Sequence, residues 1–453
     1  PSLDRDAVLT AVGQRAPALL PYARLFLGRR SSYRFLAANG EGEALHADQG
    51  VDQGDPLAPA FLAVTIRRPL DRLEARLRAL AEEEGYTPDA AADAIRVRAY
   101  LDDVLVCLPA AAAARVPGLA AASFAPAGLA VQEEKTKVWV PNGLCPAGCA
   151  AWWSPRGLRV LGAPEEADTP LAALGELGAV VGDDGLVASF LDKALQAYAA
   201  FTSKVVAATV EAGPHWSRVQ SGAGLLRLCA LPRLLHLFRA LPPAATARLA
   251  AKADAATLAG YQKLLSANLT TPPQQTQAAL PTRLGGCGMV RFQELRAQAW
   301  LGSWLGTLPA VRALAGRGLA SCEAFTSGSA SWAAALREAV AELAAEGVHL
   351  DQAGQVSGQP PAQPWGWEDG APALAQRQRL LSRRRAENAR RRLLATLPPA
   401  ARARLRGCGG PGAGAWLLAT PSSTATRFTD LEFRVCTRLR LRVPLALGRA
   451  AGR

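Results

Sequence analysis

The stretch from Ala99 to Val106 constrains the fold most, because it sets two adjacent carboxylates, Asp102 and Asp103, among apolar residues that favour strands. Aspartate suits tight turns, so the pattern predicts a β-hairpin over 95–106 with the acidic pair at its turn. Paired carboxylates supply the hard oxygen ligands that Mg²⁺ takes in proteins, and phosphoryl transfer is the chemistry that such a metal supports. The alternative is an ordinary solvated turn, which the pair alone does not exclude.

Three further blocks accompany the acidic pair along the chain. Before it, Gln53-Gly54-Asp55-Pro56 precedes a helical pattern from about Leu62, so Asp55 is expected to cap that helix, and Gly54 lets a ligand approach the backbone. After it come a block at 128–138, which contains Lys135, and a Val-Leu-Gly block at 160–162. Taken alone, Lys135 fits a solvated turn as well as a functional role.

In this order, the four blocks resemble the reverse transcriptases of LINE-type retrotransposons. The resemblance implies an α+β fold: a right-hand polymerase palm and fingers, built as an antiparallel sheet backed by helices, followed by a mostly helical thumb-like and C-terminal region. It also implies an RNA-directed DNA polymerase that extends a DNA primer on an RNA template, with dNTP as substrate, by two-metal phosphoryl transfer. The block at 158–162 resembles the primer-grip hairpin.

The same resemblance assigns roles to residues. Asp102 and Asp103 are the expected catalytic metal ligands for Mg²⁺ or Mn²⁺, and Lys135 is expected to face the triphosphate and donate a proton to the leaving pyrophosphate. The residues expected to bind the nucleotide and the template are Gln53, Gly54, Asp55, Pro56 and Tyr100. The family's first metal-binding aspartate is expected upstream of Pro1, and the chain as given is therefore expected to have impaired activity.

Positive charge is concentrated in one segment. Between Gln376 and Arg406 there are eleven arginines and one acid, Glu387, so this segment carries +10 of the net charge of +13. Arginine pairs bidentately with phosphate, which favours a nucleic-acid-binding face. The expected backbone contacts are Arg383, Arg384, Arg385, Arg390, Arg391 and Arg392. A solvated helix is the alternative for the segment, and a non-enzymatic RNA- or DNA-binding remnant is the alternative for the chain. A helical scaffold with an accidental acidic turn is a third, less favoured reading.

Composition excludes other classes of protein. No uninterrupted apolar run reaches 18 residues, so no transmembrane helix is predicted. Eight scattered cysteines without a secretory signal indicate reduced thiols and an intracellular protein of the nucleus or cytoplasm. The close pair Cys145 and Cys149 has no histidine nearby in sequence, so free thiols are favoured over zinc.

The sequence pattern predicts four regions: a partial palm and fingers over 1–165, a helical thumb-like region over 166–310, a helix and Gly/Pro/Gln-rich linker over 311–375, and an Arg-rich helical region over 376–453. Asp4 is expected to cap the first helix, and residues 21–46 are expected to form a pair of strands. A third palm strand is expected at 128–131. The glycines of 280–288 indicate a tight turn between helices.

Overall fold

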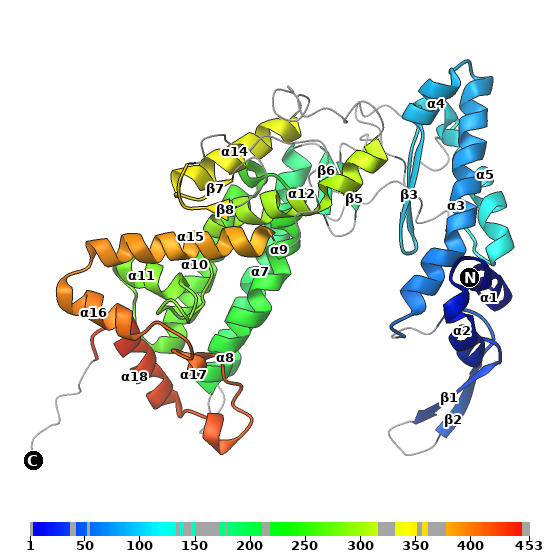
Figure 1. Cartoon of the computed structure of the whole chain (residues 1–453). Helices are drawn as coiled ribbons and strands as arrows, with labels where there is room; N and C mark the ends of the chain where they lie inside the picture. Colours follow the sequence, from blue (N-terminus) through cyan, green and yellow to red (C-terminus); the bar gives the residue numbers. More distant parts are fainter. Residues whose placement is uncertain are drawn as a thin grey trace, which may run out of the picture. The chain divides into compact units, whose positions relative to one another are not determined.

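The computed structural model describes residues 3–36, 42–51, 55–132, 136, 138, 146–149, 173–176, 179–182, 184–210, 218–315, 331–350, 356–360 and 377–445 (Figure 1). The chain divides into two compact units, and we describe each by itself. Unit 1 comprises Pro1–Val160 and Pro164–Leu174, and unit 2 comprises Leu161–Ala163 and Gly175–Arg453. Helices dominate and the sheets are small and two-stranded, which confirms the α+β class in its coarse form.

Unit 1 combines short helices, one long helix and two hairpins. Its elements are α1 (Arg5–Arg15), η1 (Pro17–Leu19), α2 (Leu20–Leu27), β1 (Ser31–Leu36), β2 (Gly42–Ala47), α3 (Ala58–Glu83), α4 (Pro88–Ala94), β3 (Arg96–Tyr100), β4 (Asp103–Cys107), η2 (Ala110–Arg115), α5 (Val116–Phe124) and η3 (Ala125–Ala127). Helix α1 begins where predicted, because the Asp4 carboxylate accepts the Ala7 N–H at 2.8 Å. Helix α3 ends before Gly85, whose φ of +94° suits glycine.

Two predictions for unit 1 need correction. Residues 20–27 form α2, and the predicted strand pair is confined to β1 and β2. The first half of that stretch is helical because its apolar residues Ala23 and Leu27 are four apart and both pack into the core. The third strand is also absent: residues 129–132 are not in a strand, although Leu129 and Val131 are partly buried against the core.

The cores of unit 1 gather along α3. Near its N-terminal half, α1 and α2 pack on Phe61. Along its C-terminal half, Leu73, Leu77 and Ala81 pack against Val97 of β3 and Phe124 of α5. The helices therefore cover the end of the β3–β4 hairpin at Val97 and Val106, and Ala99 and Val104 nearer the loop stay exposed. This backing stabilises a sheet that has only two strands in the described part of the chain.

Unit 2 is largely helical. Its elements are α7 (Asp184–Val210), α8 (Arg218–Leu225), the π-helical turn η5 (Leu226–Ala230), α9 (Leu231–Ala240), α10 (Pro243–Leu265), α11 (Pro272–Ala279), α12 (Phe292–Ala315), α14 (Ser331–Ala345), β7 (His349–Leu350), β8 (Val356–Ser357), α15 (Arg377–Thr396), α16 (Pro399–Gly407), α17 (Ala415–Leu418), η7 (Thr424–Thr426) and α18 (Asp430–Leu441). The paired strands β5 (Ala173–Glu176) and β6 (Ala179–Gly182) precede it, and the boundary between the units falls within β5. No helix in the described ranges is long and apolar enough to cross a membrane.

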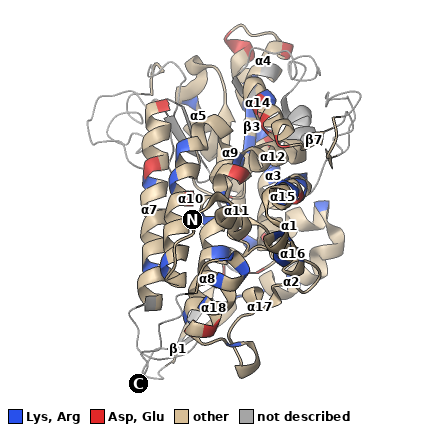
Figure 2. Cartoon of the chain, turned by 90° about the vertical axis from the view of Figure 1, so that its left-hand side faces the viewer, with Lys and Arg blue, Asp and Glu red and all other residues tan. Residues whose placement is uncertain are grey.

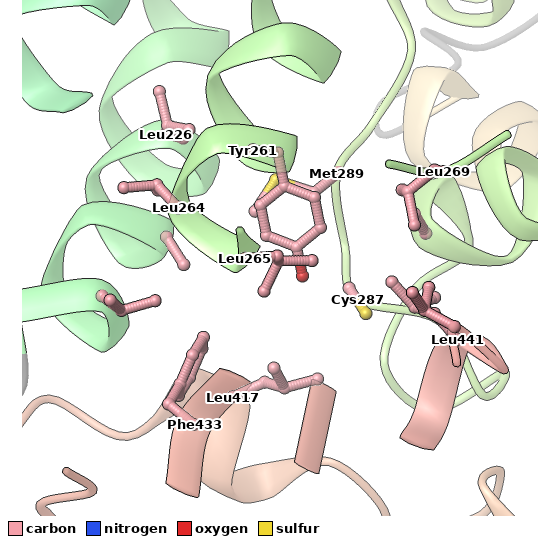
Figure 3. Packing of buried hydrophobic residues seen from close by; sticks show 14 of the residues in the cluster. Leu226, Tyr261, Leu264, Leu265, Leu269, Cys287, Met289, Leu417, Phe433 and Leu441 are labelled. Atoms are coloured by element: carbon pink, nitrogen blue, oxygen red, sulfur yellow. The ribbon is translucent and has the colours of Figure 1, made fainter. Parts of the chain in front are cut away.

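One core of unit 2 joins segments that are far apart in sequence (Figure 3). Leu226, Tyr261 and Leu264 come from the middle of the chain, and they meet Phe433 and Leu441 of α18. Helix α18 is well defined locally, because Thr429 and Glu432 form a capping box at its start. The C-terminal segment is therefore an integral part of this core.

The predicted tight turn at 280–288 is confirmed, and it joins α11 to α12. Gly285 and Gly288 adopt φ angles of +93° and +74°, and a Cβ at Gly286 would collide with the carbonyl oxygens of Leu280 and Gln277. The buried Arg440 guanidinium donates to the carbonyl oxygens of Thr282 and Gly286 at 2.9 and 3.0 Å. The glycines of this block therefore serve a buried turn that α18 holds in place.

Candidate active site

The Asp102–Asp103 pair lies at the turn of the β3–β4 hairpin, as the sequence predicts. The strands pair antiparallel, with Val97 opposite Val106 and Tyr100 opposite Asp103, which leaves Leu101 and Asp102 as a two-residue loop. The side chains of Tyr100 and Asp103 share one face of the hairpin, because they are directly opposite across the ladder. The acidic pair is thus split between the loop and the first residue of β4.

Backbone strain marks this loop. Leu101 adopts a φ of +55°, one of three non-glycine residues with positive φ in the described part of the chain. The left-handed region brings Cβ close to the following carbonyl and costs about 1–2 kcal/mol for an L-residue. Strained residues of this kind cluster at functional sites, where the surrounding structure maintains them.

Both carboxylates are exposed and available. Within the described residues, Asp102 and Asp103 accept no hydrogen bond and form no ion pair. Tyr100 beside them is 64% exposed, and Leu101 is 38% exposed. An acidic pair that the fold leaves unpaired can bind a cation or a polar ligand without first breaking an internal contact.

The strand that carries the loop is anchored to α3 through Glu74. Its carboxylate accepts the Val97 N–H at 3.4 Å, lies 3.6 Å from the Arg98 guanidinium, and pairs with Arg78 one turn along α3. Sequence patterns did not predict this anchor. The Glu-Arg spacing at 74 and 78 was the available signal for the helical pair, whereas the contact to β3 needed the tertiary fold.

The hairpin points toward the end of α3 where Asp55 and Pro56 lie. Figure 1 shows β3 and β4 running beside α3, with their loop directed toward the N-terminal end of the helix. There, Asp55 accepts the Leu57 N–H at 2.8 Å and Pro56 follows in the turn, so the helix begins at Ala58 rather than directly after Asp55. Gln53 and Gly54 lie outside the described residues.

Other predicted site residues are only partly described. Lys135 lies outside the described residues, as does the primer-grip-like block at 158–162. Thr136 is described, and its N–H donates to the carbonyl oxygen of Gln132 at 3.0 Å. Cys149 is buried, and Cys145, the other member of the close pair in sequence, is outside the described ranges.

The residues at the hairpin turn fit a divalent-cation site only in part. Asp102 and Asp103 offer the carboxylate oxygens that Mg²⁺ and Mn²⁺ prefer, and both are unpaired. No group of three or more histidine, cysteine, aspartate or glutamate residues in the described ranges could hold a metal ion. The described residues therefore offer two adjacent carboxylates at the hairpin turn and no third candidate ligand grouped with them.

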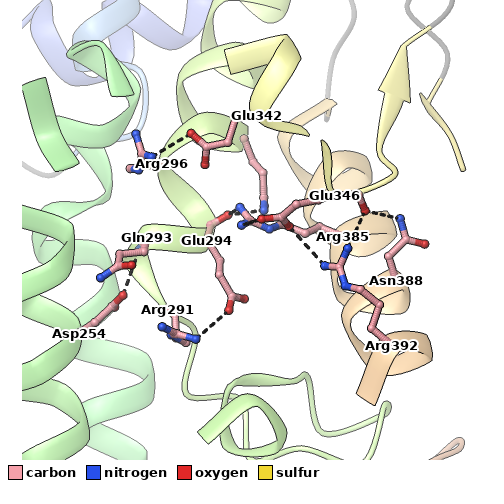
Figure 4. A network of polar contacts seen from close by, with 11 residues as sticks. Asp254, Arg291, Gln293, Glu294, Arg296, Glu342, Glu346, Arg385, Asn388 and Arg392 are labelled. Atoms are coloured by element: carbon pink, nitrogen blue, oxygen red, sulfur yellow. Dashed lines mark hydrogen bonds and ion pairs between the residues drawn. The ribbon is translucent and has the colours of Figure 1, made fainter. Parts of the chain in front are cut away.

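The six predicted phosphate-binding arginines differ in their surroundings (Figure 4). Arg385 is buried: its guanidinium pairs with Glu346 and donates to the carbonyl oxygen of Glu294. Arg392 lies 3.7 Å from the other oxygen of Glu346, and Arg383 and Arg384 pair with Glu387 at 3.0 and 3.9 Å. Arg385 thus serves the interior of unit 2, and it does not face solvent.

The remaining exposed arginines continue onto α16. Figure 2 shows basic residues gathered along α15 and α16. Arg391, Arg404 and Arg406 are exposed and have no acidic partner among the described residues, and Arg390 is half-buried. The structure thus narrows the predicted basic segment to its solvent-facing arginines, which lie on α15 and α16.

Comparisons with known proteins add no assignment. No protein-family model matches the chain, and no curated protein matches it. The chemistry of the exposed acidic hairpin is therefore the basis on which a function can be argued.

Proposed function

We propose that this chain is the polymerase part of a LINE-type retrotransposon reverse transcriptase, which extends a DNA primer on an RNA template. One observation carries the proposal: Asp102 and Asp103 are exposed and unpaired on a strained two-residue hairpin loop, whose strands pack on helices at their far end through Val97 and Val106. The two other non-glycine residues with positive φ in the described ranges, Ser266 and Arg442, are helix C-caps, whereas Leu101 lies in a hairpin loop beside the acidic pair. The order of the four sequence blocks supports the same interpretation.

In this proposal the helix-backed hairpin belongs to a polymerase palm, with fingers in the rest of unit 1 and a thumb among the helices of unit 2. Asp102 and Asp103 would hold Mg²⁺ or Mn²⁺, which supplies charge neutralisation for phosphoryl transfer when bound. Tyr100, beside Asp103, would contact the primer end. Gln53 and Gly54 would support the nucleotide and template, and Asp55 and Pro56 would set the start of α3 behind them.

Lys135 would complete the site on the substrate side. A lysine that faces a triphosphate neutralises its charge and can donate a proton to the departing pyrophosphate. The proposal therefore assigns metal binding to the acidic hairpin and stabilisation of the triphosphate to a positively charged lysine on a separate segment.

Primer extension tests the proposal. The purified chain is given an RNA template, a DNA primer and dNTP, with Mg²⁺ or Mn²⁺, beside Asp102→Asn and Asp103→Asn. We expect each substitution to reduce extension by on the order of 100-fold or more, because it removes charge at the transferring phosphoryl group. Their unfolding free energies should stay within about 0.5 kcal/mol of the parent, because both carboxylates are exposed and unpaired.

Glu82→Gln is the matched control, since Glu82 is an exposed carboxylate on α3 of the same unit. It should leave extension unchanged. Equal loss in Glu82→Gln and Asp102→Asn would contradict the proposal. So would no extension under either metal both by the parent chain and by a version that adds an upstream segment carrying the family's first aspartate.

A second candidate is nucleic-acid binding without catalysis, and the unpaired arginines of α15 and α16 favour it. Replacement of Arg391, Arg404 and Arg406 by glutamine should reduce the slope of log K against log salt by about 0.9 for each duplex phosphate that these side chains neutralise. Arg383→Gln is the control, because Arg383 already pairs with Glu387 on the same helix. Binding with this slope, combined with no extension, would favour the second candidate.

A further inference from the structure

A basic and aromatic surface lies on α2 and the start of β1, outside the four sequence blocks and the Arg-rich segment. Between Asp6 and Glu41 the sequence contains five arginines and no acidic residue. We define the basic–aromatic surface by seven residues: Tyr22, Arg24, Leu25, Phe26, Arg29, Arg30 and Arg34. All seven are exposed, and α2 leads directly toward the β1–β2 hairpin (Figure 1).

The helix presents its aromatic side chains to solvent. Tyr22, Leu25 and Phe26 are spaced i, i+3 and i+4 and therefore share one side of α2, while Ala23 and Leu27 are buried in the core. Arg29 follows just after the end of the helix. The rings of Tyr22 and Phe26 lie 4.6 Å apart and are 39% and 48% exposed. Two adjacent exposed rings form a ready platform for another planar group.

A buried arginine fixes the segment behind this platform. Arg5 is 6% exposed, and its guanidinium donates to the carbonyl oxygens of Arg29 and Gly50 at 2.8 and 3.1 Å and to the Ser31 hydroxyl at 3.0 Å. The connection between α2 and β1 is therefore held to α1. A surface held in this way loses little further conformational entropy when a ligand binds.

The charge on the surface is uncompensated. Arg24, Arg29, Arg30 and Arg34 form no ion pair within the described residues, whereas Arg15 on the neighbouring helix lies 3.9 Å from Asp71. Burial of this face against an apolar protein surface would desolvate several unpaired guanidinium groups at high cost. A partner of this surface must therefore be negatively charged, and the exposed rings favour a partner that has exposed planar groups.

We propose that the basic–aromatic surface binds single-stranded nucleic acid, with unpaired bases stacked on Tyr22 and Phe26 and phosphates held by the surrounding arginines. Single strands offer both features, because every base has a π-face and the backbone is anionic. A duplex hides its base faces in the helical stack. The proposal needs neither the acidic hairpin nor a metal, so it extends the proposed function with a separate binding site on unit 1.

Photocrosslinking of the full chain to a short single strand that contains 5-iodouracil locates the contact. Trypsin separates the two rings into the peptides 16–24 and 25–29, and we expect both to carry the cross-link. Affinity is then measured by fluorescence anisotropy in the Arg391→Gln/Arg404→Gln/Arg406→Gln background, so that the second basic surface contributes little. DNA and RNA single strands are compared with a duplex of the same sequence.

The key variant is Tyr22→Leu/Phe26→Leu, which keeps the helix and its apolar contacts but removes the rings. We expect single-strand affinity to fall about tenfold or more, because the bases lose the aromatic rings on which they stack, and the salt slope to stay unchanged. Replacement of Arg24, Arg29 and Arg30 by glutamine should reduce that slope by about 0.7 for each phosphate that these side chains neutralise. Tyr86→Leu is the control, since Tyr86 is 38% exposed in the same unit.

Three outcomes would overturn the proposal. In the first, Tyr22→Leu/Phe26→Leu binds the single strand as tightly as the parent and the cross-links map elsewhere; in the second, the parent binds duplex and single strand equally well. In the third, the parent chain self-associates and the two leucine substitutions dissociate it. The last result would make the surface a protein contact. A folding failure is recognised by circular dichroism, and the cross-link sites on the parent chain still decide the question. Asp102→Asn should bind the single strand as the parent does, so failure of the polymerase proposal and of this one are distinguishable.

Discussion

Two tight turns, one in each unit, differ in how fully the fold accounts for them. The turn at 280–288 is buried, its glycines occupy positions that exclude a side chain, and Arg440 and Gln277 donate to its carbonyl oxygens. The turn at Leu101–Asp102 is exposed, its positive φ falls on a leucine, and its two carboxylates have no partner among the described residues. The first turn is explained by stability, and the second is the one that calls for a function.

Substitution of Gly286 should lower stability more than any other change discussed below. A small loss of stability would contradict the conclusion that the buried turn is explained by stability. A methyl group there collides with the carbonyl oxygens of Leu280 and Gln277, which are backbone atoms and cannot move alone. We expect Gly286→Ala to lower the unfolding free energy of unit 2 by about 4 kcal/mol or more, as measured by denaturant unfolding. Gly306→Ala is the control, since a Cβ at Gly306 meets nothing within 4 Å.

The carboxylate beside the buried turn should show a pH effect of intermediate size. Asp254 accepts the N–H groups of Phe292 and Gln293 at 2.6 and 3.1 Å, at the start of α12. Burial nevertheless raises the pKa of the Asp254 carboxyl to about 6. Because this pKa lies above the unfolded value of about 3.9, the folded state binds the proton more tightly.

The contribution of Asp254 to the unfolding free energy is therefore complete below about pH 4. It falls by at most about 3 kcal/mol as the pH rises to about 6. The unfolding free energy of the parent minus that of Asp254→Asn, measured from pH 4 to pH 7, should decrease over this window. A difference that grows with pH would show that the helix N–H groups dominate over burial.

Substitution of Leu101 should give the smallest effect and the opposite sign. Glycine adopts a φ of +55° without the steric cost that leucine has, so Leu101→Gly should stabilise unit 1 by about 1 kcal/mol, less the entropy that glycine adds to the unfolded chain. Thermal unfolding measures the change, and primer extension by the same variant measures whether strain in the loop matters for activity. A destabilised variant would mean that the leucine side chain makes contacts that outweigh the strain.

Local patterns predicted much of this structure. Asp4 caps its helix, the hairpin over 95–106 forms with the acidic pair at its turn, and the glycines of 280–288 make a turn between helices. Each of these depends on residues close in sequence. The helix at 20–27 was missed because its burial is set by α1 and by Phe61 of α3, contacts that a local alternation pattern does not contain.

The candidate site shows the same limit. Residue type and order predicted Asp102 and Asp103, but the Glu74 anchor behind them and the burial of Arg385 within an arginine run depend on tertiary packing. An arginine in a basic helix gives the same sequence pattern whether its guanidinium faces phosphate or Glu346. The count of charges therefore identified the basic segment, but it did not show which of its arginine side chains are exposed to solvent.

The attachment of α18 has a consequence for how the chain is made. Asp430 accepts the Val219 N–H at 3.0 Å, and Arg434 donates to the Leu264 carbonyl oxygen at 2.9 Å, so these contacts span 211 and 170 residues of sequence. On the ribosome, the core around Tyr261 and Leu264 must wait for α18 to emerge, and contacts of such long separation form slowly. Messages interrupted before residue 430 would yield chains with this apolar core uncovered, which are natural targets for chaperones and proteases.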